Sequence, residues 1–167
     1  MKKFAAILAL AFMVGACSEK KETTTLSSQE TSATREADTS IPVTAVVITG
    51  NDNMKFDKTE FTVKVNQEVS IELKNVGVME KEVMGHNLVI LNQGVDVEAF
   101  AKAAEAEVAT EYIPASLADN IFAHTKLLGP GESETIKVTF TESGDYTYLC
   151  TFPNHHLYMK GIIHVVE

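Results

Sequence analysis

The sequence is short of basic residues, and this limits the partners that it can bind. Lysine and arginine together number 14, against 23 aspartate and glutamate residues, so the formal net charge is −9 at pH 7. Nucleic acids and anionic lipid surfaces are negatively charged, and proteins bind them largely through positive surface charge. The composition therefore argues against electrostatic binding to nucleic acid or to an anionic membrane surface.

Long hydrophobic runs are also missing, apart from one short run at the start. Met1-Lys2-Lys3 is basic, and the apolar stretch from Phe4 to Ala16 follows it. This stretch is shorter than the roughly 20 residues that a transmembrane helix needs, and the pattern is typical of a secretory signal. We therefore predict a signal peptide at residues 1–16, with an uncleaved anchor as the alternative.

Cysteine occurs at only two positions, Cys17 and Cys150. Val14-Gly15-Ala16-Cys17 resembles the lipobox of bacterial lipoproteins, which implies cleavage before Cys17 and lipidation of its side chain. An ordinary signal peptide beside an incidental cysteine is the alternative. If Cys17 is lipidated, no intramolecular disulfide can form, even in an oxidising export compartment. Cys150 is then a free thiol, which a bound metal would protect from oxidation.

The segment after Cys17 has few large apolar residues and is rich in Ser, Thr and Glu. Such a composition cannot bury enough surface to offset the entropy of ordering. We therefore predict a lipidated, flexible tether at residues 17–41 and one folded domain at residues 42–167. Ser18 resembles the sorting signal of outer-membrane lipoproteins. The expected location is the periplasmic side of a bacterial membrane, in particular the outer membrane.

The folded domain is predicted to be all-β. Alternating or β-branched runs predict strands at 43–49, 60–65, 68–73, 86–91, 133–140, 145–150 and 160–166. One segment rich in Ala and Glu, residues 98–110, predicts a helix. Regularly spaced strands with one helical insertion are typical of a Greek-key β-sandwich. Tyr146, Tyr148 and Cys150 share one face of their strand, which directs Cys150 inward.

A group of metal donors lies near the end of the sequence. Cys150-Thr-Phe-Pro-Asn-His155-His156-Leu-Tyr-Met159 offers a thiolate, imidazoles and a thioether, and His86 lies far upstream. Two histidines, a cysteine and a weak axial methionine form the donor set of a blue-copper site. Taken singly, residues of these types are more often structural than metal ligands. The combined pattern favours copper, and its spacing selects His155 over His156, which we expect to face solvent.

Four motifs resemble those of azurin, the bacterial cupredoxin, and occur in the same order. They are Gly50-Asn-Asp-Asn-Met-Lys-Phe56, Met84-Gly85-His86-Asn87, Ala123-His-Thr-Lys-Leu-Leu-Gly129, and Cys150-Thr-Phe-Pro-Asn-His155 with Met159-Lys-Gly161. The resemblance covers about Thr44 to Val166. It implies a cupredoxin fold, one copper ion that cycles between Cu(II) and Cu(I), and electron transfer rather than enzymatic activity.

The resemblance also implies a role for individual residues. The implied copper ligands are His86, Cys150 and His155 in a plane, Met159 as a long axial ligand and the Gly85 carbonyl opposite it. Asn87 and the Phe152 amide would support the cysteine sulfur through hydrogen bonds. The edge of His155 would emerge in an apolar patch for redox partners, formed by Met54, Met79, Val83, Met84, Phe152 and Pro153. The implied partners are c-type cytochromes and a periplasmic reductase or peroxidase.

The sequence departs from azurin at several positions. Leu88 stands where azurins often carry a buried tryptophan, and Asn75 where many carry a histidine. Asn154 replaces the glycine that usually precedes the second histidine ligand, a change that could alter the conformation of the loop. None of these departures falls on an implied ligand.

Two other functions remain open at this point. One is a copper-binding module for metal delivery or resistance, although such proteins tend to expose their ligands. The other is a structural zinc site, although an axial methionine suits copper better than zinc.

Overall fold

The structure is a computed structural model that describes residues 39–167, so the predicted signal peptide, Cys17 and most of the predicted tether lie outside the described residues. The described part contains strands β1 (Ala45–Asn51), β2 (Lys55–Phe56), β3 (Glu60–Lys64), β4 (Glu68–Asn75), β5 (Val89–Leu91), β6 (Ile121–His124), β7 (Ser133–Thr139), β8 (Gly144–Leu149) and β9 (Lys160–Val166). Its helices are α1 (Lys81–Met84), α2 (Val97–Ala104) and short 3₁₀ helices at Val108–Thr110, Ala115–Asn120 and His155–Leu157. None of the helices described is long and apolar enough to cross a membrane.

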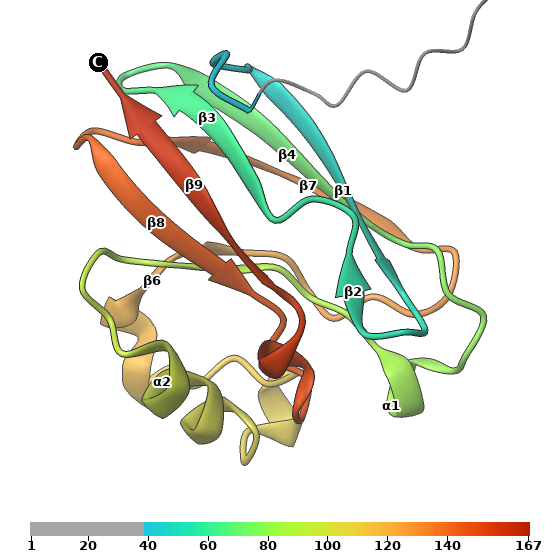
Figure 1. The fold of residues 1–167 in the computed structure, drawn as a ribbon. Coiled ribbons are helices and arrows are strands. Elements are labelled where there is room, and N and C mark those ends of the chain that lie inside the picture. Colours follow the sequence, from blue (N-terminus) through green and yellow to red (C-terminus); the bar gives the residue numbers. More distant parts are fainter. Residues whose placement is uncertain (1–38) are drawn as a thin grey trace, which may run out of the picture. The chain divides into compact units, whose positions relative to one another are not determined.

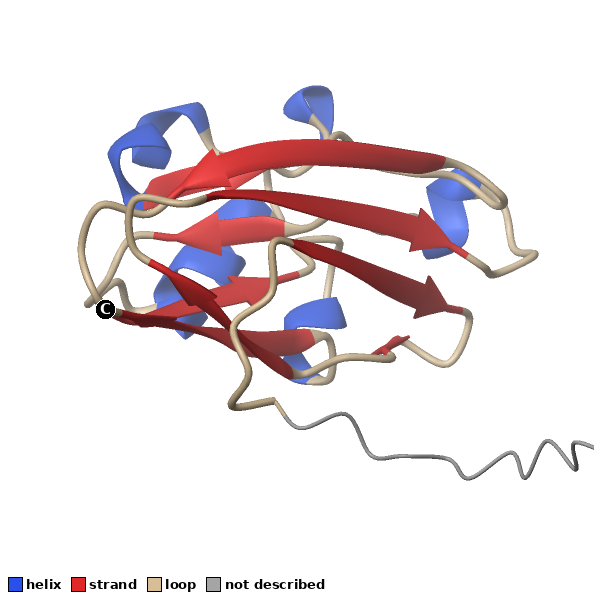
Figure 2. Ribbon diagram, turned by 90° about the horizontal axis from the view of Figure 1, so that it is seen from above, coloured by secondary structure: helices blue, strands red, loops and turns tan. Residues whose placement is uncertain are grey.

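The strands form two sheets that pack face to face (Figure 1). One sheet has the order β2-β1-β4-β7 and the other β3-β9-β8-β5-β6. The pairs β1–β4 and β3–β9 are parallel, and the remaining pairs are antiparallel. In both sheets the strands run along the length of the domain (Figure 2). The prediction of an all-β sandwich is therefore confirmed.

The alternation of apolar and polar residues places the core between the sheets. In β4, for example, Val69, Ile71 and Leu73 are buried, whereas the residues between them are partly exposed. A second cluster lies under α2 and contains Val89, Leu91, Phe100, Ala101 and Leu149. Strand β5 is buried at every position because its two faces contribute to different clusters.

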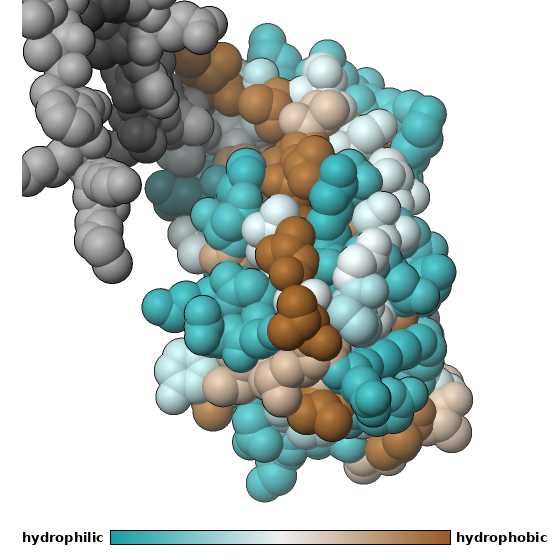
Figure 3. Space-filling model, turned by 90° about the vertical axis from the view of Figure 1, so that its right-hand side faces the viewer, coloured by the Kyte–Doolittle hydropathy of each residue, from teal (hydrophilic) through white to brown (hydrophobic). Residues whose placement is uncertain are grey.

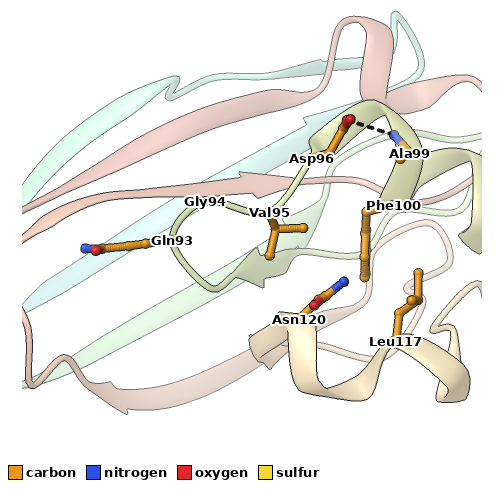
Figure 4. Close-up of a pocket in the computed structure, with 8 residues that line it drawn as sticks. All are labelled: Gln93, Gly94, Val95, Asp96, Ala99, Phe100, Leu117 and Asn120. Carbon is orange, nitrogen blue, oxygen red and sulfur yellow. Dashed lines mark hydrogen bonds between the residues drawn. The ribbon is translucent and has the colours of Figure 1, made fainter.

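Helix α2 is fixed at its start and along one face. Its N-cap is Asp96, whose side chain accepts a hydrogen bond of 3.1 Å from the Ala99 amide (Figure 4). Phe100, Ala101 and Ala104 are its buried residues. Since Phe100 and Ala101 pack in the cluster with β5 and β8, α2 has a defined position beside the end of β8.

The helix is shorter than the sequence predicts. It ends at Ala104 rather than at residue 110, and a 3₁₀ turn at Val108–Thr110 follows. Glu111 and Tyr112 then adopt positive φ angles of 55° and 65°, a conformation that a right-handed helix cannot contain. The chain thereby turns back toward the end of the sandwich that carries His86, since the Glu111 carbonyl accepts a hydrogen bond from Asn87.

Other elements differ from the prediction in their ends. The strand predicted from residue 86 begins at Val89, and His86 forms only an isolated bridge with Leu128. The first strand begins and ends two residues later than predicted and includes Gly50 and Asn51. Strands β2 and β6 and helix α1 are not predicted from the sequence, because segments of two to four residues are too short to show periodicity.

Candidate metal centre

Three buried donors come together at one end of the sandwich. The ligand atoms of His86, Cys150 and His155 all lie within 4.8 Å of one another. Cys150 Sγ is 3.5 Å from His155 Nδ1, and the two imidazole centroids are 5.1 Å apart. Within residues 39–167, no other group of three or more His, Cys, Asp or Glu side chains converges in this way.

Cys150 and His155 belong to one loop, residues 150–159, which we call the ligand loop. Cys150 directly follows β8 and lies in the main core with Tyr146 and Tyr148, as the alternation along the strand predicts. The Cys150 amide donates to the Met159 carbonyl at 2.9 Å, and the Met159 amide donates to the His155 carbonyl at 2.7 Å. These hydrogen bonds close the loop, so that its donors lie on the same side as the core.

His86 is oriented by the end of β1. Its Nε2 lies 3.1 Å from the Asn51 carbonyl, which assigns the proton to Nε2 and leaves a lone pair on Nδ1. Nδ1 is buried and has no hydrogen-bond partner. A buried polar atom without a partner is uncommon in folded proteins, and a metal ion bound at Nδ1 would satisfy this one.

Met159 lies against the same glycine as His86. A Cβ added to Gly50 would be 2.8 Å from His86 Cδ2 and 3.2 Å from Met159 Cε. Both side chains therefore approach Gly50 closely, and Met159 itself is fully buried. Gly85 is buried as well. The axial roles of Met159 and of the Gly85 carbonyl remain predictions.

Asn87 joins the two segments that carry the donors. Its Nδ2 donates to Thr151 Oγ1 at 2.8 Å, and its Oδ1 accepts the Thr151 amide at 2.8 Å. Nδ2 also donates to the Glu111 carbonyl at 3.3 Å. The backbone amides of Asn87 and Phe152 hydrogen-bond the Cys150 sulfur. The residues next to two of the donors thus hold the sulfur in place.

Burial keeps all three donors uncharged at neutral pH. It raises the pKa of the Cys150 thiol to about 12, although the amide hydrogen bonds to the sulfur act in the opposite direction. Burial and the neighbouring His86 lower the pKa of His155 to about 4, and burial lowers the pKa of His86. Two neutral imidazoles are ready to bind a cation, whereas the thiol must lose its proton. Thiolate, thioether and imidazole together suit copper.

Two expectations about the loop histidines are wrong. His156 does not face solvent: it is only 7% exposed, and its Nε2 lies 3.2 Å from Glu98 Oε2 of α2. The edge of His155 does not emerge at the surface, because the residue is only 2% exposed and the Phe152 ring packs on it at 4.6 Å between centroids. The sequence predicts the helix, but not that the helix packs on the ligand loop and contacts His156.

Two residues that support the site, Glu111 and Tyr112, lie outside the azurin-like motifs and are not predicted from the sequence. Glu111 accepts a hydrogen bond from the Leu127 amide at 3.1 Å and pairs with Lys81 Nζ at 2.5 Å. Tyr112 packs edge-on against Phe152, with 5.1 Å between ring centroids. The local sequence pattern does not mark Glu111 or Tyr112 as site residues. They approach the site because the backbone has positive φ angles at both residues.

A surface depression near α2 is not an alternative metal site, because its lining lacks the necessary donors. Its volume is about 650 Å³, and its lining residues are Gln93, Gly94, Val95, Asp96, Ala99, Phe100, Leu117 and Asn120 (Figure 4). The lining contains no cysteine or histidine, and its single acid, Asp96, is engaged as the helix cap.

Comparisons with known proteins agree with the geometry. Residues 43–166 match the family model of copper-binding proteins, plastocyanin/azurin family. Azurin-1 of Alcaligenes xylosoxydans xylosoxydans is 39% identical over 127 residues, which cover 74% of this chain and 98% of that protein. Outer membrane protein H.8 of Neisseria gonorrhoeae is 37% identical over 126 residues, covering 74% of this chain and 68% of that protein.

The similarity extends to a solved structure. The dithionite-reduced auracyanin of the photosynthetic bacterium Roseiflexus castenholzii superposes with a TM-score of 0.65 at 37% identity, covering 75% of this chain and 99% of the other. The predicted cupredoxin fold is therefore confirmed. Together with the buried His86, Cys150 and His155 cluster, these similarities show that the chain belongs to the plastocyanin/azurin family of copper-binding proteins and that copper is its cofactor.

Proposed function

We propose that this chain is a membrane-tethered electron carrier in which His86, Cys150 and His155 bind one copper ion. The carrying observation is the convergence of a buried thiol with two neutral imidazoles, one of which has an unpartnered nitrogen. When bound, copper supplies a one-electron couple between Cu(II) and Cu(I). Met159, which is fully buried, and the Gly85 carbonyl would add a thioether and a carbonyl oxygen as further ligands.

The protein part of this function is to hold the donors still and to exclude water. Asn51 fixes His86, Asn87 fixes the start of the ligand loop, and the Cys150–Met159 hydrogen bond closes the loop. Donors held by packed neighbours move little when the charge of the ion changes, which favours fast electron transfer. Their burial disfavours metal delivery, because a delivery protein must release its ion to a partner.

The surface beside the donors provides a docking patch for redox partners. The patch consists of Met54, Met79, Val83, Met84 and Pro153. Met79 and Val83 are 40% and 52% exposed, and the other three are partly exposed. Figure 3 shows a band of hydrophobic side chains on the side where α1 lies in Figure 1. An apolar surface near a buried redox site allows close approach of a partner without charge desolvation.

The proposed setting is the periplasmic face of a bacterial membrane, with lipidated Cys17 as the anchor. The lipobox-like run before Cys17 supports this setting, and a 37% identical relative is named an outer membrane protein. The outer membrane is the proposed membrane. The proposed partners are c-type cytochromes and a periplasmic reductase or peroxidase.

Copper titration tests the proposed site. Adding one equivalent of Cu(II) to the apoprotein should give an intense blue absorption that a one-electron reductant bleaches reversibly. Cys150→Ser should abolish the colour, since the thiolate is lost, whereas His124→Ala at an exposed histidine should retain it. A colourless wild-type protein that binds copper, or a preference for zinc, would contradict the proposal.

Proton release on copper binding follows from the pKa shifts. At pH 7 the Cys150 thiol is protonated because its pKa is about 12, and His155 is neutral because its pKa is about 4. Copper uptake should therefore release about one proton per ion at pH 7, and more as the pH falls toward 4 and the histidines become protonated. Calorimetry in buffers of different ionisation enthalpy measures this number. Cys150→Ser should release almost none at pH 7, and a wild-type value near zero would show a preformed thiolate.

A charge in the docking patch should slow electron exchange. In Met84→Glu, self-exchange between oxidised and reduced copies should fall by about an order of magnitude, because each encounter must bury a carboxylate. The copper absorption should not change. Val166→Glu is the matched control, since Val166 is similarly apolar but lies at the far end of β9 from the ligand loop. Equal rates in Met84→Glu and wild type would exclude this patch as the contact surface.

The anchor can be tested in cells. When the full chain is expressed in a Gram-negative host, wild type should incorporate radiolabelled palmitate and sediment with the membranes. Cys17→Ser should lose the label and appear in a soluble fraction, with the copper absorption intact. Membrane association that does not depend on Cys17 would contradict lipid anchoring.

A further inference from the structure

One side of α2 contacts the ligand loop through polar side chains. Glu98 Oε2 lies 3.2 Å from His156 Nε2 of the loop, and Glu98 Oε1 lies 3.3 Å from Nζ of Lys160, the first residue of β9. Further along the chain, Glu105 Oε1 accepts the Asn154 amide at 3.1 Å. Glu98 and Glu105 are seven residues apart, a spacing that places both on the same face of a helix. Glu105 is the C-cap and keeps a helical backbone, so this face continues to it.

His156 is the most deeply buried member of this contact. Its Nε2 faces the Glu98 carboxylate, which assigns the ring proton to Nε2. Its Nδ1 is buried without a hydrogen-bond partner and lies 3.9 Å from Glu105 Oε1. The two nitrogens face different glutamates, so these groups do not converge on a common point as metal ligands would. The ring instead fills the space between the loop and the helix.

The contacts flank His155 on both sides. Asn154, which precedes it, is held by Glu105, and His156, which follows it, is held by Glu98. The helix that provides both acids is itself fixed by the Asp96 cap (Figure 4). It is also fixed by the burial of Phe100 and Ala101. A donor between two anchored neighbours loses little further conformational entropy when a metal binds, because its backbone is already ordered.

We propose that His156 is a positioning residue, which clamps the ligand loop to α2 through Glu98 and thereby holds His155 in its metal-binding orientation. This inference rests on the copper site proposed above. His156 does not bind the metal. It acts on the rate at which His155 can leave the metal, and on the geometry that His155 keeps when the metal is reduced.

The test uses the copper-loaded full chain and three variants of the clamp. His156→Phe keeps a ring but lacks the donor, and His156→Gln places an amide donor near the position of Nε2. Mutation of a residue that orients a metal ligand commonly lowers the metal affinity 10–100-fold. We therefore expect copper transfer to an excess of chelator to be about tenfold faster in His156→Phe, and to return to within about threefold of wild type in His156→Gln. Glu98→Ala should also accelerate release, and the reduction potential should shift in His156→Phe but not in His156→Gln.

Glu68→Ala is the matched control. Glu68 and Glu98 have side chains that are each 61% exposed, and each pairs with a lysine, at 3.1 and 3.3 Å respectively. Glu68 lies on β4, outside the contact between α2 and the loop. Release from Glu68→Ala should match wild type. A wild-type rate in His156→Phe, or equal acceleration in Glu68→Ala and Glu98→Ala, would overturn the clamp.

A measurement on the apoprotein separates the clamp from the copper proposal. The Tyr158 amide donates to the His155 carbonyl at 3.0 Å, so its hydrogen exchange reports opening of the loop without metal. Faster exchange in His156→Phe, with recovery in His156→Gln, supports the clamp even if the wild-type protein shows no blue colour. Unchanged exchange would overturn the clamp even if the protein binds copper as proposed.

Discussion

The hydrogen bonds of the Asn87 side chain hold together two segments that are far apart in the sequence. Asn87 adjoins His86, and Thr151 adjoins Cys150, so the pair of hydrogen bonds between them sets the distance between two donors. Both bonds are buried, where an unmatched amide would be costly, and this cost favours the paired arrangement over any other. The third contact of Asn87, with the Glu111 carbonyl, adds the segment after α2 to the same network. The sandwich provides the strands, but the arrangement of the donors depends on the hydrogen bonds of the Asn87 side chain.

The same burial that fixes the donors also sets their charge. A thiol with a pKa of about 12 and an imidazole with a pKa of about 4 are both neutral over the physiological range. The Cys150 sulfur is therefore protonated at neutral pH rather than a buried thiolate, which would be costly in a low-dielectric interior. The metal provides the charge that makes a buried thiolate favourable, and the Asn87 and Phe152 amides are already directed at the sulfur. Burial also limits the contact of this free thiol with oxidants.

The sequence was sufficient for the features that depend on local pattern. Alternation in β8 correctly placed Tyr146, Tyr148 and Cys150 on the core face, and the spacing of donors selected three side chains that the structure brings together. It failed where the outcome depends on tertiary contacts. The helix ended early because the backbone leaves the helical conformation at Glu107, with φ −96° and ψ 52°, and His156 became buried because α2 covers it. The Asn51 carbonyl that orients His86 could not be identified either, since backbone contacts leave no mark in side-chain patterns.

Asn154 stands where the resemblance to azurin leads us to expect a glycine, and its backbone adopts a conformation that glycine favours. Its φ of 64° and ψ of −4° lie in the left-handed region, where most side chains are strained but asparagine is tolerated better than most. Glycine adopts this conformation without strain, yet it has more freedom to lose on folding. Asparagine thus adopts the same turn as a glycine could, and it gives the unfolded loop less conformational entropy to lose on folding. The Asn154 amide also donates to Glu105, so the turn that precedes His155 is tied to the C-cap of α2.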